Sequence, residues 1–313
     1  IIEQKLIDNE VIFKFTHQKL RKYIYDNLSM IRRRVLHEKA AQVLERNLRG
    51  DQSDVLLYSK IIYNYSKSEN QFKTLEYTLK NANVYLDYNH ELYPKCSMPT
   101  SEKDNNILYF TNQKIIPYFH RLEEMINRLE MQRYSINEIL RLKIMLNLMR
   151  GRYLIRMGQY DEGVSSVKRV IEDAGEVLNC EFLLMGHRQM IYYCIQTNDV
   201  ELMKKEIQIS IEISQKMEND SEKATLLRLK GLNKIMSLEY EEADMLLRES
   251  IILFERLNQR QNIYSLNIAA AYNYMGEIKR LNMDFEEAIK YYDKAIEICK
   301  RKGVIRSLAI FYI

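Results

Sequence analysis

The chain has 313 residues, of which only 3 are Pro and 9 are Gly, and its formal net charge is +4. This scarcity of helix breakers among many helix formers excludes a strand-rich chain and favours an almost all-helical, all-α fold. The charge is uneven: residues 1–50 carry 11 Lys and Arg against 6 Asp and Glu, whereas the remainder carries 36 against 37. The longer part therefore gives no net-charge signal for binding a polyanion.

Cysteine usage and hydropathy indicate the compartment. The four cysteines form no C-x-x-C pair and none lies beside a His at metal-ligand spacing. We expect reduced, mostly buried thiols and no metal site. No apolar run approaches the ~18 residues that cross a bilayer, and no signal peptide is evident. We therefore expect a cytoplasmic protein without membrane contact, and we expect the chain to be a piece of a longer polypeptide.

The first elements predicted along the chain are one strand and two helices. Val11–Thr16 alternates and is rich in β-formers, which predicts a short strand. Helices are predicted over His17–Leu28 and Met30–Leu48, with Ser29 as an N-cap and Gly50 as a stop. This order fits the end of a small winged-helix-type domain.

The middle of the chain is predicted to be helical around one loop. Apolar residues at helical spacing predict helices over Asp54–Ser66 and Phe72–Tyr88. The polar stretch Tyr93–Asn106 holds two of the prolines and predicts a mobile loop. A helix follows from about Ile115 to Met131, and Pro117 is predicted to lie in its first turn.

From Ile136 onward a repeat of about 40 residues dominates. Each copy has a small residue, an aromatic nine positions later, an acidic pair and another small residue. The copies are Gly151–Gly163, Gly231–Ala243, Gly276–Ala288 and a degenerate one at Ile191–Met203. Such periodicity predicts stacked helical hairpins, which usually form a binding surface. The small residues are predicted to lie where two helices cross, and the acidic pairs at the start of each second helix, where the helix dipole favours negative charge.

This pattern resembles the tetratricopeptide repeat. The best match is Ala271–Ile296, with Tyr272, Gly276 and Phe285 at family positions, followed by Ala288, Tyr292 and Ala295. The usual terminal proline is replaced by Lys300, and the period is 40 rather than 34 residues. The resemblance implies a tetratricopeptide-like α-α superhelix with lengthened helices.

A second resemblance covers Phe13–Leu44. This segment is similar to the end of the winged-helix region in large bacterial signal-transduction ATPases of the STAND type, which include LuxR-like transcriptional activators. The matching residues are Phe13, Phe15, His17, Tyr25, Leu28, Ser29, Arg33, Leu36 and His37. The resemblance implies residues 1–50 as a winged-helix-like remnant and residues 51–313 as the repeat domain, truncated at residue 313. It also implies a neighbouring ATPase domain and a repeat array that senses an inducer or partner in transcription regulation.

No motif for chemistry stands out. The sequence lacks phosphate-loop, dinucleotide, nucleophile-elbow and zinc-protease signatures. His17 and His37 are interpreted as packing and hydrogen-bonding residues of the N-terminal fold, and Arg32-Arg33-Arg34 as a solvated helix face. We therefore predict no enzyme activity, no cofactor and no direct nucleic-acid binding.

The inward-facing positions implied by the tetratricopeptide resemblance place five arginines against one acid on the first helices. The polar candidates on this first-helix wall are Arg152, Arg156, Arg188, Tyr192, Gln196, Arg228, Asn273 and Arg280. Arginine suits carboxylates and phosphates, so the hypothesis is a groove for an acidic peptide, a protein partner or a small anionic inducer. Reversing Arg152 and Arg188 to Glu is expected to abolish capture without unfolding. The alternative is a solvated wall whose apolar positions a neighbouring domain covers.

Three functional interpretations stay open. The first is a regulatory protein- or inducer-binding module of a signal-transduction ATPase. The second is a generic scaffold or adaptor without an ATPase parent. The third is a nucleic-acid binder that uses residues 14–49, for which salt-dependent DNA binding is the test.

Overall fold

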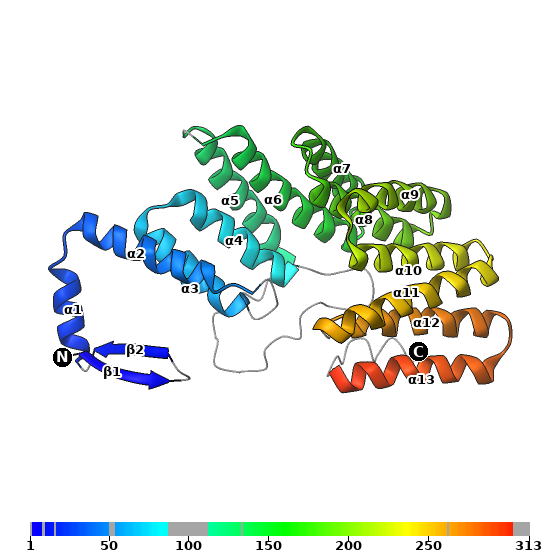
Figure 1. The fold of residues 1–313 in the computed structure, drawn as a ribbon. Helices are drawn as coiled ribbons and strands as arrows, with labels where there is room; N and C mark the ends of the chain where they lie inside the picture. Colours follow the sequence, from blue (N-terminus) through cyan, green and yellow to red (C-terminus); the bar gives the residue numbers. More distant parts are fainter. Residues whose placement is uncertain are drawn as a thin grey trace. The chain divides into compact units, whose positions relative to one another are not determined.

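The computed structural model describes residues 2–7, 10–15, 17–49, 54–86, 112–132, 134–261 and 263–302. Over these residues the chain is all-helical apart from one N-terminal β-hairpin (Figure 1). Contacts divide it into two compact units, Ile1–Ala82 and Asn83–Ile313. The predicted stop at Gly50, loop at Tyr93–Asn106 and helix beyond Gly303 lie outside the described residues.

The first unit begins with strands β1 (Ile2–Ile7) and β2 (Glu10–Phe15), which pair antiparallel with Ile2 opposite Phe15 and Ile7 opposite Glu10. The strand at 11–16 was predicted and β1 was not, because I-E-Q-K-L-I does not alternate. Four helices follow in the chain: α1 (Gln18–Asp26), α2 (Met30–Arg46), α3 (Val55–Ser68) and α4 (Gln71–Leu86). Ser29 caps α2 as predicted, because its Oγ accepts from the Arg32 N–H.

Four of the residues that carry the second resemblance, Tyr25, Leu28, Arg33 and His37, lie in one cluster of contacts. The Tyr25 hydroxyl lies 2.9 Å from His37 Nε2, and His37 Nδ1 lies 2.8 Å from Asn64 Oδ1. Arg33 donates to the carbonyls of Leu28 and Asp26 and lies over the Tyr25 ring. These contacts join α1, α2 and α3, so the structural interpretation of His37 is confirmed. His17 is exposed and its side chain makes no capping bond to α1.

A partly buried ionic cluster holds α2, α3 and α4 together. Tyr65 and Tyr77 stack in the core, and the Tyr65 hydroxyl donates to Glu45. Lys73 Nζ lies 3.0 Å from both Glu45 and Glu76. These contacts group α3 and most of α4 with the N-terminal segment, so the unit boundary falls after Ala82 within α4. The division into a winged-helix-like remnant at 1–50 and a repeat domain at 51–313 stays a prediction.

Glu76 makes the stability of this cluster depend on pH. Burial opposes its ionisation, but hydrogen bonds and charge from Lys80 and Lys73 outweigh burial and lower its pKa. A lowered folded pKa stabilises the fold above the unfolded carboxyl pKa of about 4.3, and that stability is lost as pH falls through the folded pKa. We expect Glu76→Gln to lower the free energy of unfolding at pH 7, and we expect its difference from wild type to shrink as pH falls below about 4.3 and through the lowered folded pKa. Urea titrations at pH 7, 5 and 3.5 measure this difference, and a pH-independent difference would contradict the ionic role.

The second unit starts with α5 (Asn112–Glu130), which packs on α6. It begins earlier than predicted, so Pro117 lies inside the helix beyond its first turn. Four hairpins follow. Their first helices are α6 (Ile136–Arg156), α8 (Cys180–Thr197), α10 (Asp220–Met236) and α12 (Ser265–Leu281). Their second helices are α7 (Tyr160–Glu176), α9 (Val200–Met217), α11 (Tyr240–Gln261) and α13 (Phe285–Lys302).

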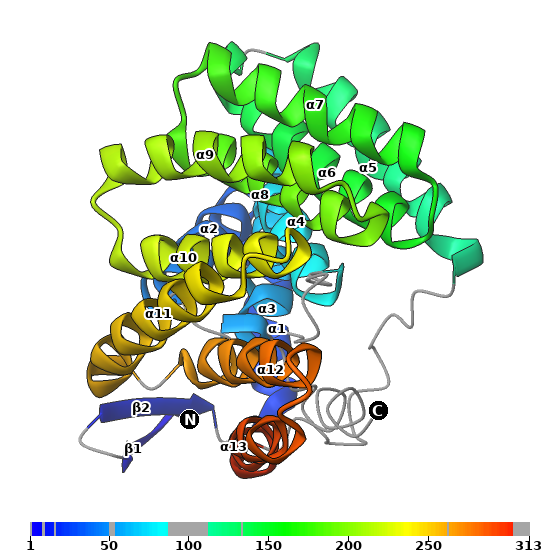
Figure 2. The ribbon, with the colours of Figure 1, turned by 90° about the vertical axis from the view of Figure 1, so that its right-hand side faces the viewer.

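The hairpins stack in chain order. Each second helix packs on the first helix of its own hairpin, and α7, α9 and α11 also pack on the next first helix. Figures 1 and 2 show the successive hairpins side by side. The predicted solenoid is confirmed. The acidic pairs lie in the first turns of α7, α11 and α13 as predicted.

The small residues allow the two helices of a hairpin to approach closely. A Cβ added at Gly151 would lie 2.6 Å from Val167 and 3.0 Å from the Gly163 carbonyl oxygen. One added at Gly276 would lie 2.5 Å from the Tyr292 ring. The predicted crossing positions are therefore correct.

The turn within each hairpin uses one left-handed residue, seven positions after the crossing residue. These residues are Gly158, Asn198, Leu238 and Met283. Gly and Asn adopt positive φ readily, whereas a branched or long side chain there costs about 1–2 kcal/mol. Leu238 and Met283 carry this local cost, and both side chains are exposed.

Candidate functional site

Three of the predicted wall arginines link one helix to the next. Arg188 Nη1 of α8 donates to both carboxylate oxygens of Glu222 in α10, at 2.9 and 2.8 Å. Arg228 Nη2 of α10 donates to Asn267 Oδ1 of α12, and Arg152 Nη1 of α6 donates to Asn83 Oδ1, both at 3.4 Å. These side chains therefore hold neighbouring layers of the second unit in register.

Their burial makes two of these arginines structural. Arg228 is fully buried and Arg152 is 9% exposed. Burying a charge is tolerated only with compensating partners. Charge reversal at Arg152 is therefore expected to unfold the chain, so the predicted pair of reversals at Arg152 and Arg188 is not a clean test of binding.

The wall carries less net positive charge than its five arginines and one acidic residue suggest. Glu222 does not lie at one of the predicted inward-facing positions, yet it neutralises Arg188. Arg280 pairs with Glu277 on its own helix, at 2.7 Å. Tyr192 is buried and Asn273 is half-buried. An excess of positive charge available to a guest is therefore not a property of this wall.

One row of the wall reaches the protein surface. Four equivalent positions, five after each crossing residue, are at least partly exposed. They are Arg156, Gln196, Met236 and Leu281, and we call them the open row. The row presents a cation, an amide and two apolar side chains at the carboxyl ends of successive first helices. The hydrogen bonds between layers hold its spacing, so an extended segment finds a preorganised surface.

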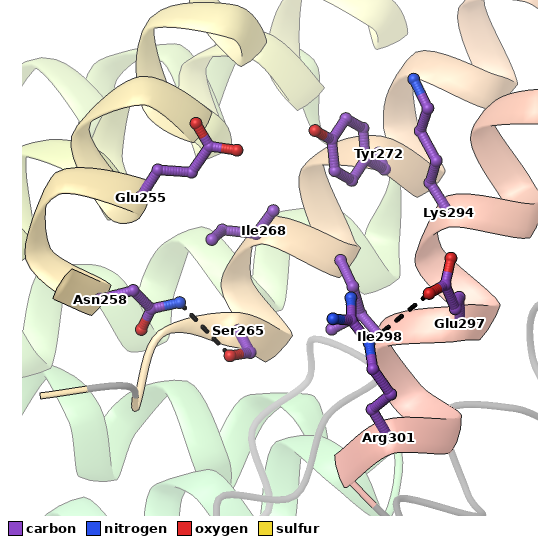
Figure 3. A pocket seen from close by; sticks show the side chains of 9 residues that line it. All are labelled: Glu255, Asn258, Ser265, Ile268, Tyr272, Lys294, Glu297, Ile298 and Arg301. Carbon is purple, nitrogen blue, oxygen red and sulfur yellow. Dashed lines mark hydrogen bonds and ion pairs between the residues drawn. The ribbon is translucent and has the colours of Figure 1, made fainter.

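A separate cleft lies among α11, α12 and α13 (Figure 3). It has a volume of about 640 Å³ and is lined by Glu255, Asn258, Ser265, Ile268, Tyr272, Lys294, Glu297, Ile298 and Arg301. Sequence reasoning missed it, although Lys294, Ile298 and Arg301 recur at helical spacing on α13. Its position between two second helices depends on how successive hairpins pack.

Aromatic stacking builds one wall of this cleft. Tyr272 of α12 stacks on Tyr291 of α13 with 6.3 Å between ring centroids. Lys294 Nζ lies 5.4 Å from the Tyr272 centroid and 5.1 Å from that of Tyr291. Burial and the nearby Glu255 carboxylate raise the pKa of Tyr272, so its hydroxyl stays protonated. The cleft offers an apolar floor, a hydroxyl donor and both signs of charge, which suits binding of a peptide.

The thiol of Cys194 is unreactive. Burial raises the pKa of the Cys194 thiol to about 12, so it is a protonated core residue. Across the part of the chain that the structure describes, no three His, Cys, Asp or Glu side chains cluster in a way that suits a metal. Within the same residues, no helix combines the length and apolar character that a bilayer crossing requires.

Comparisons with known proteins support the fold. No protein-family model and no curated protein matches the sequence. Among solved structures, the chain is similar to the crystal structure of BtubC (BKLC) from P. vanneervenii, with a TM-score of 0.50 and 11% sequence identity. The alignment covers 89% of this chain and 94% of that chain. At this identity the two proteins share a fold, and the likeness carries no statement about function.

Proposed function

We propose that the chain is a non-catalytic regulatory module that binds a protein or peptide partner. Its parent would be a bacterial, cytoplasmic signal-transduction ATPase or transcriptional activator of the STAND type. The second resemblance supports this parent, because four of its motif residues, Tyr25, Leu28, Arg33 and His37, lie in contacts that join α1, α2 and α3. In such a parent, partner binding to the repeats controls the nucleotide switch.

The observation that carries the binding role is the open row. A repeated set of side chains on a stack of hydrogen-bonded hairpins fits an extended peptide, which contacts several layers at once. A small anionic inducer is less well supported at the first-helix wall, because Arg188 and Arg280 already bind carboxylates of the chain itself.

Charge reversal in the open row tests this role. We expect Arg156→Glu combined with Gln196→Glu to reduce capture of partners from a native cell extract by at least about tenfold, because two adjacent layers lose their contacts. Quantitative mass spectrometry on the immobilised chain measures the capture. Lys168→Glu, an exposed residue of α7, is the matched control and should retain it. Equal capture by all three chains, with unchanged circular dichroism, would remove the open row as the binding surface.

The scaffold alternative is distinguished by the parent gene. A phosphate-loop ATPase domain encoded before Ile1 supports the regulatory role, and a reading frame without one supports a generic scaffold or adaptor. The measurement that follows is the ATPase rate of the full-length protein with and without the captured partner. A partner that binds the open row and leaves that rate unchanged would favour the scaffold.

A further inference from the structure

A second cleft lies between the second and third hairpins and is basic. It has a volume of about 480 Å³ and is formed by the first two-thirds of α9, the end of α10 and the first turn of α11. Its lining residues are Glu201, Lys204, Lys205, Ile207, Gln208, Ile211, Lys230, Asn233, Lys234 and Glu242. Four lysines therefore converge with two glutamates, and none belongs to the first-helix wall predicted from the sequence.

The two glutamates are explained by the fold. Glu201 and Glu242 lie in the first turns of α9 and α11, where the helix dipole favours a carboxylate. Lys234 Nζ lies 2.8 Å from Glu242 and 2.7 Å from Glu239, so this lysine is occupied. The hydrogen bond from Lys234 lowers the pKa of Glu242, and the charges of Lys230 and Lys204 add to that effect. Lys204 and Lys230 therefore both lie near the Glu242 carboxylate, although they belong to different helices.

The other three lysines are not explained by the fold. Within the described residues, Lys204, Lys205 and Lys230 make no hydrogen bond or ion pair. Three ammonium groups on two adjacent helices repel one another, and the chain supplies no carboxylate that neutralises all three. A group with two negative charges and several acceptor oxygens would do so.

We propose that this cleft binds a phosphate monoester carried by a peptide, such as a phosphoserine or phosphothreonine of a partner protein. The phosphate carries about −1.5 to −2 charge at pH 7 and three acceptor oxygens, which matches three lysines better than a single carboxylate does. The cleft is larger than one phosphate group, and Gln208 and Ile211 line it together with the lysines. This size favours a phosphate attached to a chain over free phosphate.

The flanking carboxylates argue against nucleic acid. Glu201 and Glu242 border the lysines on α9 and α11. An extended backbone would place successive phosphates beside these carboxylates, which repel it, whereas a single phosphate contacts only the lysines. The proposal does not depend on the open row, because the two surfaces share no residue.

Fluorescence anisotropy tests the cleft on the whole chain. The probe is a labelled nine-residue peptide of Gly and Ala with one central phosphoserine, beside its unphosphorylated twin. We expect the phosphopeptide to bind at least about tenfold more tightly than the twin and to weaken as salt rises. Lys204→Gln with Lys230→Gln should remove that difference, and Lys168→Gln should leave it unchanged. Glu201→Gln should strengthen binding, because it removes a repulsive charge from the border.

Each outcome decides the proposal. Equal binding of the twin, or unchanged binding by the Lys204→Gln and Lys230→Gln chain, would overturn it. If inorganic phosphate competes at the same concentration as the peptide, the ligand of the cleft would be a free anion and not a phosphopeptide. If a single-stranded DNA decamer binds more tightly than the phosphopeptide, the ligand of the cleft would be nucleic acid. Circular dichroism of each variant keeps a folding defect apart from a loss of binding.

Discussion

One added methyl group at Gly163 will destabilise the protein by about 1–3 kcal/mol, the usual cost of overpacking a core contact. The Cβ of Gly163→Ala would lie 2.8 Å from the Ile155 backbone nitrogen and 2.7 Å from its Cγ1. A backbone atom cannot move aside as a side-chain tip can, so α6 and α7 must separate. The expected loss exceeds the intrinsic helix gain of about 0.8–1.0 kcal/mol for replacing Gly by Ala.

Gly175 on the same helix is the matched control. It lies in α7, and a Cβ added there meets nothing within 4 Å. Gly175→Ala is therefore expected to stabilise the chain by about 0.4–1 kcal/mol. Thermal and urea unfolding of the two variants are expected to give changes of opposite sign in the free energy of unfolding for the same Gly→Ala substitution. A stabilising Gly163→Ala would show that the α6–α7 crossing is looser than the contacts require.

Truncating Arg228 to Ala will cost about 2–5 kcal/mol, which is the range for removing a large, fully buried side chain. The side chain is fully buried in α10 and its Nη2 donates to Asn267 of α12, so its loss leaves a cavity and an unpaired amide between two layers. Arg280→Ala, on the same wall, removes only an exposed pair with Glu277. Its effect on stability is expected to be small, because water screens an exposed ion pair.

Arg228→Met separates packing from charge. Replacing a buried charge by an apolar side chain of similar length is often neutral or stabilising, so this variant should recover most of the stability lost in Arg228→Ala. Urea midpoints of the three variants measure these effects. An Arg228→Ala chain as stable as wild type would show that this arginine does not hold the layers together and would return it to the candidate binding residues.

Much of the repeat region was predictable because its signals are local. The period of 40, the aromatic turn and the acidic pair at 241–242 follow from positions within one hairpin, and all of them correspond to observed elements. Pro117 was placed wrongly because the start of α5 depends on residues before the proline, whose pattern is weak. The strand β1 was missed because its pairing with β2 defines it, and pairing is not a property of one segment.

The sequence by itself determined the helical hairpins, their order and the points where they cross, because helix periodicity and the size of Gly and Ala act within a few turns. Only the tertiary structure decided which wall arginines are exposed, since Glu222 and Asn267 approach Arg188 and Arg228 from the next layer of the stack. It also decided where the two clefts lie, because each opens between second helices that the chain separates by a whole first helix. The periodicity of the sequence specifies which face of a helix a side chain occupies, whereas packing between hairpins specifies which residues contact that side chain.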